Sequence, residues 1–221
     1  MLSFNLLFFF IYLFFFVLMF IVLLKKKNEN FHEDEIFSYG LSNNQLDVVF
    51  KYQKYESPNE IFYKNYLVVK QNSRFNYFKV WENQSKDVHP PLYYVFLHTI
   101  CSFFPGKFSK WFAGSINIFF ALLTLITLKK LVLNLTNNKD ICIIVSFIFI
   151  FSPGILSSIS FLRMYILAMF FVSLLTYSII IEIDKSDNQF YFYLKLYFIS
   201  LFGALIHYYC IFFTISICFF F

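Results

Sequence analysis

The chain has 221 residues, of which 59% are hydrophobic and only 14% are charged, and its formal net charge is +5. Because soluble domains average about 25% charged residues, this composition argues against an ordinary soluble globular protein and predicts an all-α integral membrane protein. The basic residues form no stripe with interleaved aromatics, so we expect no nucleic-acid partner.

The first 24 residues form an uninterrupted apolar run that ends at Lys25-Lys26-Lys27. About 20 apolar residues suffice to cross the hydrocarbon core of a bilayer. The run has no basic N-terminal region and no small-residue cleavage site, so it is not typical of a cleaved signal peptide. We therefore expect residues 1–24 to form a retained first transmembrane helix.

Residues 25–91 form the long polar segment of the chain, with 10 of the 18 Lys/Arg and 9 of the 13 Asp/Glu. Two apolar clusters within it, Ile61–Val69 and Phe75–Trp81, are too short to cross a membrane. They fit short amphipathic helices on the membrane interface, with aromatic rings at headgroup depth, or an irregular loop. The sequence leaves both interpretations open.

Three consecutive acids, Glu33, Asp34 and Glu35, follow His32 near the start of this segment. Acidic residues are favoured in the first turn of a helix, so one interpretation is the solvated start of a surface helix. A carboxylate held beside a bilayer is also suited to act as a general base.

Asp87 and His89 precede Pro90-Pro91 at the end of the polar segment. Proline is tolerated in the first turn of a helix, so we expect a membrane helix from about Leu92 to Phe104. The alternative for Asp87 is an ordinary position near the helix cap.

Residues 92–221 are predicted to form a multi-span transmembrane bundle. Pro153-Gly154 interrupts one apolar run, and such breaks usually line a cavity or are buried in protein. With the first helix we expect six or seven membrane segments. The sequence stops within an apolar run, at Cys218–Phe221, which predicts a bundle that is incomplete at its C-terminus.

Two ionisable residues interrupt the apolar runs. Arg163 would cost at least about 2.5 kcal/mol at bilayer depth, which marks a candidate functional site. Its planar fork of donors suits a phosphate, although an interfacial arginine that reaches the headgroups is an alternative. His207 is either a hydrogen-bonded structural residue or part of a site. The four cysteines lack CxxC spacing and are interpreted as small buried hydrophobic residues.

Four motifs occur in a characteristic order. They are His-Glu-Asp-Glu-Ile-Phe-Ser-Tyr-Gly-Leu-Ser-Asn at 32–43, Asp-Val-His-Pro-Pro-Leu-Tyr-Tyr at 87–94, Arg-Met-Tyr at 163–165 after a Ser-Pro break, and His-Tyr-Tyr at 207–209. Together they resemble the bacterial branch of the dolichyl-phosphate-mannose protein mannosyltransferase-like glycosyltransferases. That family has the GT-C membrane fold and includes the lipid A aminoarabinose transferases.

The resemblance implies a multi-pass plasma-membrane enzyme whose residues 25–91 lie on the extracytoplasmic side. Such an enzyme moves a sugar from a polyprenyl-phosphate carrier to a glycan, lipid or protein acceptor by an inverting displacement, and membrane lipid is a further partner. No cofactor is certain, although a divalent metal is possible, and no metal ligand is assigned.

The resemblance also implies site residues. Asp34 corresponds to the catalytic base and Glu35 to the neighbour that orients the acceptor. Donor or substrate binding is implied for Asp87 and His89, for Arg163 and Tyr165, and for His207 and Tyr208. The phosphate contact of Arg163 is an inference from its chemistry.

Two other classes remain open: a transporter or flippase whose pathway is lined by Arg163 and His207, and an inactive truncated transferase. The sequence also gives conflicting signals about the side of the membrane on which residues 25–91 lie. Lys25–Lys27 would place the following segment in the cytoplasm by the positive-inside rule, but that rule weakens for loops above about 60 residues.

Overall fold

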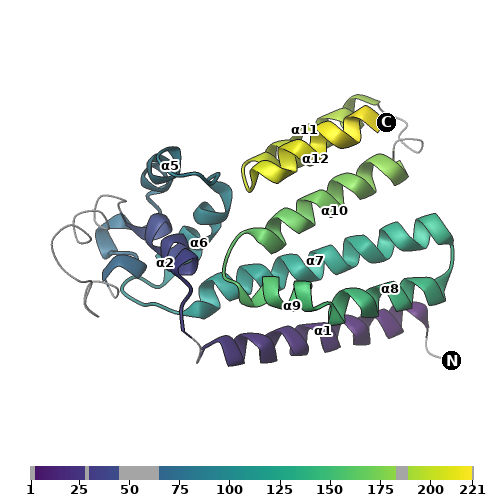
Figure 1. Ribbon diagram of the computed structural model, residues 1–221, viewed down its shortest axis with the longest axis horizontal. Coiled ribbons are helices and arrows are strands. Elements are labelled where there is room, and N and C mark those ends of the chain that lie inside the picture. The colour runs from purple at the N-terminus through teal and green to yellow at the C-terminus, as the bar shows by residue number, and fades with distance from the viewer. Residues whose placement is uncertain (1–2, 28–29, 45–64, 183–188, 221) are drawn as a thin grey trace.

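The computed structural model describes residues 3–27, 30–44, 65–182 and 189–220, and the regular structure in these ranges is entirely helical. Figure 1 shows two parts, a bundle of long helices and a smaller lobe at one end of it. The bundle contains α1 (Phe4–Lys27), α7 (Lys110–Thr136), α8 (Lys139–Phe151), α9 (Pro153–Ser160), α10 (Tyr165–Glu182), α11 (Gln189–Ala204) and α12 (Tyr208–Phe220). The lobe contains α2 (Glu33–Asn43), a short 3₁₀ turn (Gln71–Ser73), α5 (Tyr77–Ser85) and α6 (Leu92–Phe103).

Two of the described helices, α1 and α7, are long and apolar enough to cross a membrane. A third crossing results if α8 and α9, which meet at a bend of 49°, form one broken span. The bend confirms the expected interruption at Pro153, which occupies the first turn of α9, where its missing N–H costs no hydrogen bond. The structure thus supports a helical membrane protein with two or three spans among the described residues, and a larger number stays a prediction.

Helix α6 occupies the position where we expected a membrane helix from Leu92 to Phe104. Its 12 residues extend only about 18 Å, whereas the hydrocarbon core is about 30 Å thick. It packs against α2 and α5 in the lobe and also contacts α7 (Figure 1). The lobe is therefore built from α6 and from the described parts of the segment expected at 25–91, apart from Lys25–Lys27, which belong to α1.

Helix α1 packs into the bundle through one stripe of side chains. Phe8, Ile11, Phe15, Met19 and Leu23 recur every three or four residues and are buried, mainly against α7 and α9. The remaining faces of α1 expose Phe and Leu side chains, as expected for a helix whose solvent is lipid.

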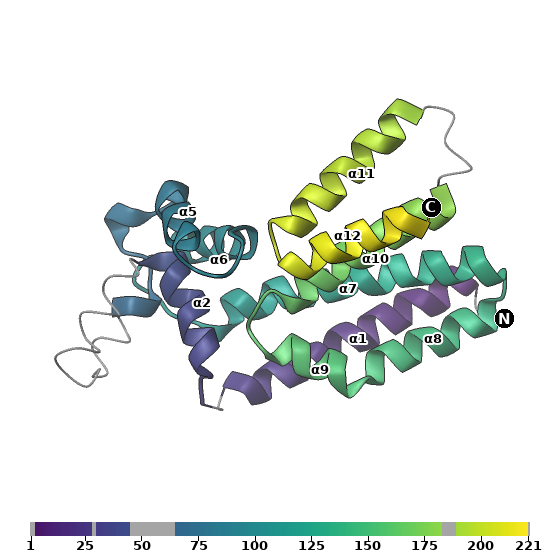
Figure 2. The same cartoon turned by 45° about the horizontal axis from the view of Figure 1, so that its top comes forward.

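The bundle helices run back and forth so that several of their ends meet the lobe. Figures 1 and 2 both place the C-terminal end of α1, the N-terminal ends of α7 and α10, and the connection between α11 and α12 at the lobe end. This arrangement brings segments that are distant in sequence to one end of the bundle.

Candidate functional site

The candidate site lies where the lobe meets the bundle, and it is built from four separate segments. These are the first turn of α2, residues 87–91 before α6, residues 161–164 between α9 and α10, and residues 205–207 between α11 and α12. The second and fourth segments are joined directly, because the backbone N–H of Leu92 donates to the carbonyl of Leu205 at 2.9 Å.

The first turn of α2 places its acids in different surroundings. His32 is the N-cap: its Nδ1 accepts the backbone N–H of Asp34, while the Glu35 carboxylate accepts the backbone N–H of His32. This reciprocal capping box fixes the start of the helix. The interpretation of the acids as a helix start is therefore confirmed, and it coexists with the site described below.

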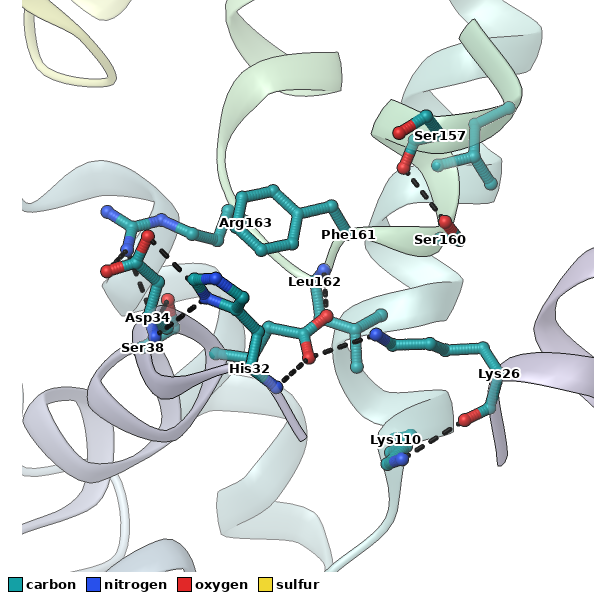
Figure 3. Close-up of polar contacts among 12 residues, drawn as sticks. Lys26, His32, Asp34, Ser38, Lys110, Ser157, Ser160, Phe161, Leu162 and Arg163 are labelled. Carbon is teal, nitrogen blue, oxygen red and sulfur yellow. Dashed lines mark hydrogen bonds and ion pairs between the residues drawn. The ribbon is translucent and has the colours of Figure 1, made fainter. Parts of the chain in front are cut away.

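Glu35 is fully buried and joins three parts of the molecule. Its carboxylate lies 3.1 Å from Lys26 Nζ of α1 and accepts the backbone N–H of Leu162 at 3.0 Å, in addition to that of His32 at 2.9 Å (Figure 3). Both carboxylate oxygens are thus engaged within the protein. This geometry favours a positioning role for Glu35 over the direct contact with an acceptor that the sequence resemblance implied.

The connection between α9 and α10 is also held from α7. Asn117 of α7 is buried, and its Nδ2 donates to the carbonyls of Ile159 and Phe161, each at 3.0 Å. A side-chain amide that bonds across helices stabilises backbone that would otherwise be unpaired in an apolar setting. Glu35 and Asn117 therefore fix the backbone that leads into Arg163, at residues 159–162.

Arg163 pairs with Asp34 across the junction. Its Nη1 lies 3.1 Å from Asp34 Oδ1 and 3.4 Å from the Asp34 carbonyl (Figure 3). The arginine side chain is only 4% exposed, whereas that of Asp34 is 48% exposed. Arg163 Nε is buried without a hydrogen-bond partner among the described residues. The pair thus combines a buried, fixed positive charge with a carboxylate that remains open to solvent.

His89 supports Arg163 from the other side. Arg163 Nη2 lies 2.9 Å from His89 Nε2, and His89 Nδ1 lies 3.2 Å from Asp87 Oδ2. Because a guanidinium can only donate, Nε2 must accept and the imidazole proton must be on Nδ1, where it donates to Asp87. Burial raises the pKa of Asp87, but hydrogen bonds from the His89 side chain and from nearby backbone N–H groups outweigh it and hold that pKa below its usual value.

Aromatic rings enclose the remaining side of the site. The His207 ring lies 6.3 Å from that of His89 and 5.9 Å from that of Tyr165. Burial lowers the pKa of His207, and the nearby charge of Arg163 lowers it further. Nδ1 of His207 accepts the backbone N–H of Tyr209 at 3.2 Å, which leaves Nε2 to carry the proton of the neutral ring.

Most of the residues expected from the sequence therefore meet at one place: Asp34, Glu35, Asp87, His89, Arg163, Tyr165 and His207. Tyr208 differs, since it is half exposed on the first turn of α12, and its neighbour Tyr209 packs on His207 with ring centroids 4.6 Å apart. Within the described ranges, no three His, Cys, Asp or Glu side chains are grouped closely enough to hold a metal ion.

Sequence reasoning missed three residues that build the site: Lys26, Asn117 and Tyr209. Lys26 was interpreted only as a flanking charge of the first helix. A polar amide inside the apolar run of α7 is a signal that could have drawn attention to Asn117, because such groups are costly in lipid unless they are paired. We see no sequence signal that distinguishes Tyr209 from Tyr208.

Comparison with protein-family models, with curated proteins and with solved structures finds no match for this chain. The fold and the site define the chain as a helical protein with two or three helices able to span a membrane, and with a buried cluster of charged groups at one end of its bundle.

Proposed function

We propose that this protein is a membrane glycosyltransferase that takes a sugar from a polyprenyl-phosphate carrier, with the GT-C type of fold that its motifs resemble. One observation carries the proposal: a half-exposed carboxylate, Asp34, lies beside a buried arginine, Arg163, at the end of an apolar bundle. A lipid-linked donor brings its phosphate to that depth, since its hydrocarbon tail lies in the bilayer and its headgroup lies at the interface.

The two groups suit the two halves of a single displacement. Asp34 takes the proton from the acceptor hydroxyl, and the acceptor oxygen forms a bond to the anomeric carbon of the sugar. The bond from that carbon to the phosphate oxygen breaks, and its electron pair leaves with the lipid phosphate. Arg163 stabilises the charge on the leaving phosphate, and one displacement inverts the anomeric configuration.

Arg163 needs a fixed position to serve the donor, and three neighbours supply it. Glu35 and Asn117 hold the backbone just before it, and neutral His89 accepts a hydrogen bond from its guanidinium. We assign Asp87 and His89 to positioning Arg163. The Asp87 carboxylate fixes the proton of His89 on Nδ1, so that Nε2 is free to accept from Arg163. We assign the sugar of the donor to the neighbourhood of His207 and Tyr165, whose rings lie 5.9 Å apart.

Activity on the extracytoplasmic side of a plasma membrane, and the larger number of spans typical of the GT-C fold, belong to the same proposal. The lysine cluster in the last turn of α1 counts against that orientation by the positive-inside rule, but the rule weakens for loops above about 60 residues. Lys26 is buried against Glu35, whereas Lys25 and Lys27 are exposed at that end of α1.

The test is release of free polyprenyl phosphate from a mixed pool of polyprenyl-phosphate sugars by membranes that carry the chain. This product is common to all such donors, so the assay requires no knowledge of the sugar. We expect release by the wild type, loss of release in Asp34→Asn, and unchanged release in Glu33→Gln, whose carboxylate is exposed on the same helical turn. Release that is unaffected by Asp34→Asn would refute the assignment of the base.

A further inference from the structure

Helix α5 has its polar and apolar faces reversed relative to an ordinary surface helix. The residues that it buries against the lobe are Val80 and two amides, Asn83 and Gln84. The residues that it exposes include Phe78, which is 81% exposed, and Trp81, which is 53% exposed. A helix that faces water shows the opposite arrangement, with its apolar stripe turned to the core.

One of the inward amides, Asn83, holds α5 in this orientation. Asn83 Nδ2 donates to the carbonyl of Leu41 at 2.8 Å and thereby ties α5 to the end of α2. The ring of Tyr77 lies against His98, and its hydroxyl accepts from Thr99 at 3.2 Å, which ties α5 to α6. The outward position of Phe78 and Trp81 is therefore a fixed property of the lobe.

The exposed aromatic surface continues at Phe75, which has a left-handed backbone with φ of 55°. This conformation is uncommon for a bulky residue and persists only where the surroundings impose it. Ser102 of α6 does so here, since its hydroxyl accepts the N–H of Phe75 at 3.0 Å and its carbonyl accepts from Arg74 Nε at 2.8 Å. The strained turn holds the Phe75 ring at the surface, edge-to-face with Phe103 at 5.3 Å.

This surface is continuous with the lipid-facing side of α7. Phe104, just after α6, stacks on Phe112 in the first turns of α7 at 5.3 Å, and Phe96 of α6 contacts Phe120 at 5.9 Å. Between the two helices lies an almost wholly apolar groove of about 330 Å³. Its lining residues are Phe96, Thr99, Ile100, Ser115, Ile116, Phe119 and Phe120. Because α7 is long and apolar enough to cross the bilayer, α6 must lie near the depth at which α7 leaves the membrane.

We propose that the outward side chains of Phe75, Tyr77, Phe78, Trp81 and Phe103, here called the aromatic face, dock the lobe on the lipid surface. Trp and Tyr prefer the boundary between headgroups and acyl chains, and apolar groups reach just below it. Arg74 is exposed, and its guanidinium lies 5.4 Å from the Phe75 ring, where it can meet lipid phosphates. The bilayer supplies the apolar solvent that the reversed polarity of α5 requires.

Docking of the aromatic face fixes the height of the candidate site above the membrane. Helix α2, which carries Asp34, packs against both α5 and α6, so the three helices move as one lobe. A lobe that is seated on the lipid holds Asp34 and Arg163 at headgroup depth. This inference concerns the placement of the lobe, and it stands whether or not the chain transfers sugars.

The two tryptophans of the chain, Trp81 and Trp111, allow a direct test in reconstituted vesicles. In the variant Trp111→Phe, the fluorescence of the full chain reports on Trp81 alone. We expect lipids brominated near the top of their acyl chains to quench Trp81 strongly and aqueous acrylamide to quench it weakly. The variant Trp81→Phe gives the reference, because Trp111 lies in the first turn of α7, packed on Phe20 at 4.9 Å.

The expected result is that brominated lipid removes at least as much emission from Trp81 as from the Trp111 reference. Strong quenching by acrylamide with little by brominated lipid would show that the aromatic face is in water and would overturn the proposal. Protection from both quenchers would show that protein covers the face, and it would overturn the proposal equally. Adding Phe78→Asp to Trp111→Phe should weaken the quenching of Trp81 by lipid, whereas adding Ser85→Asp, on an exposed residue of the same helix, should not.

Discussion

The two ends of helix α1 are both fastened by lysines, but in different ways. At the lobe end, Lys26 pairs with a buried carboxylate, Glu35, at 3.1 Å. At the far end, Lys129 of α7 lies over the rings of Phe8 and Phe4, with its Nζ 4.2 Å and 5.1 Å from the ring centroids. Within the described ranges, the contact at the far end thus joins α1 and α7 without a carboxylate partner.

The difference indicates that joining helices does not by itself require the acids found at the lobe end. A cation over an aromatic face gives about 0.5–1 kcal/mol at an exposed site and needs no buried anion. Burying an ion pair carries a desolvation cost that often cancels its attraction. The lobe end bears that cost at Lys26–Glu35 and, for the arginine alone, at Asp34–Arg163, and each pair fixes a group of the candidate site.

The largest expected effect is the loss of the buried pair at the lobe end. Glu35→Gln removes the charge that Lys26 faces and turns an amide NH₂ toward a backbone N–H, so we expect a loss of about 3 kcal/mol in the free energy of unfolding. Glu33→Gln, at an exposed position, should change it by less than about 0.5 kcal/mol. Denaturant titration in mixed micelles measures both variants, and equal values would remove the distinction between the two ends.

Arg163→Ala tests whether the second pair at the lobe end acts on the donor phosphate. Removing a fixed cation that faces developing charge typically costs about 100-fold in rate. We expect kcat/KM for the polyprenyl-phosphate donor to fall by about that factor and the KM for the acceptor to change little. Equal losses for donor and acceptor in steady-state kinetics would count against a contact with the donor phosphate.

Acid should destabilise the packing at the lobe end and leave the packing at the far end unaffected. The pKa of His207 is lowered, so the folded protein favours its neutral form. Above the usual histidine pKa of 6.5, His207 is neutral in both the folded and the unfolded chain and costs no stability. As the pH falls below 6.5, the unfolded chain binds the proton more readily, so the free energy of unfolding declines. We expect a moderate loss of transfer and of thermal stability in that window, and His207→Gln should flatten both profiles. An unchanged profile in this variant would mean that other groups set the pH dependence.

The smallest effect is expected at the far end. Lys129→Ala removes the cation over Phe8 and Phe4 and should lower the free energy of unfolding by about 0.5–1 kcal/mol. Lys130→Ala, which removes an exposed neighbour, serves as the control and should have a smaller effect. Transfer per folded protein should be the same in both variants. A loss of transfer in Lys129→Ala would show that the far end also shapes the site.

The sequence could predict those features that local chemistry determines. The acids at 33–35 start a helix because they favour its first turn, and Pro153 breaks a span because it cannot continue the preceding helix. The grouping of Asp34, His89 and Arg163 followed from the resemblance of their motifs. None of these features requires knowledge of which helices pack together.

The remaining features depend on tertiary packing. Adjacent residues in a helix point about 100° apart, so one of Asp34 and Glu35 faces the core. Only the tertiary contacts of Glu35 with Lys26 and Leu162 show which one it is. The partnership of Lys26 with Glu35 and that of Asn117 with residues 159–161 likewise arise from contacts between distant segments. The reversal of α5 is visible only once its buried face is known.

The most direct test of the central claim compares the two neighbouring carboxylates in one experiment. Release of polyprenyl phosphate by Asp34→Asn and by Glu35→Gln is measured per folded protein, together with the stability of each variant. We predict that Asp34→Asn stays folded and releases no product above background, whereas Glu35→Gln is destabilised but its folded fraction still turns over. Full activity in Asp34→Asn, with none in folded Glu35→Gln, would contradict the assignment of chemistry to Asp34 and of positioning to Glu35.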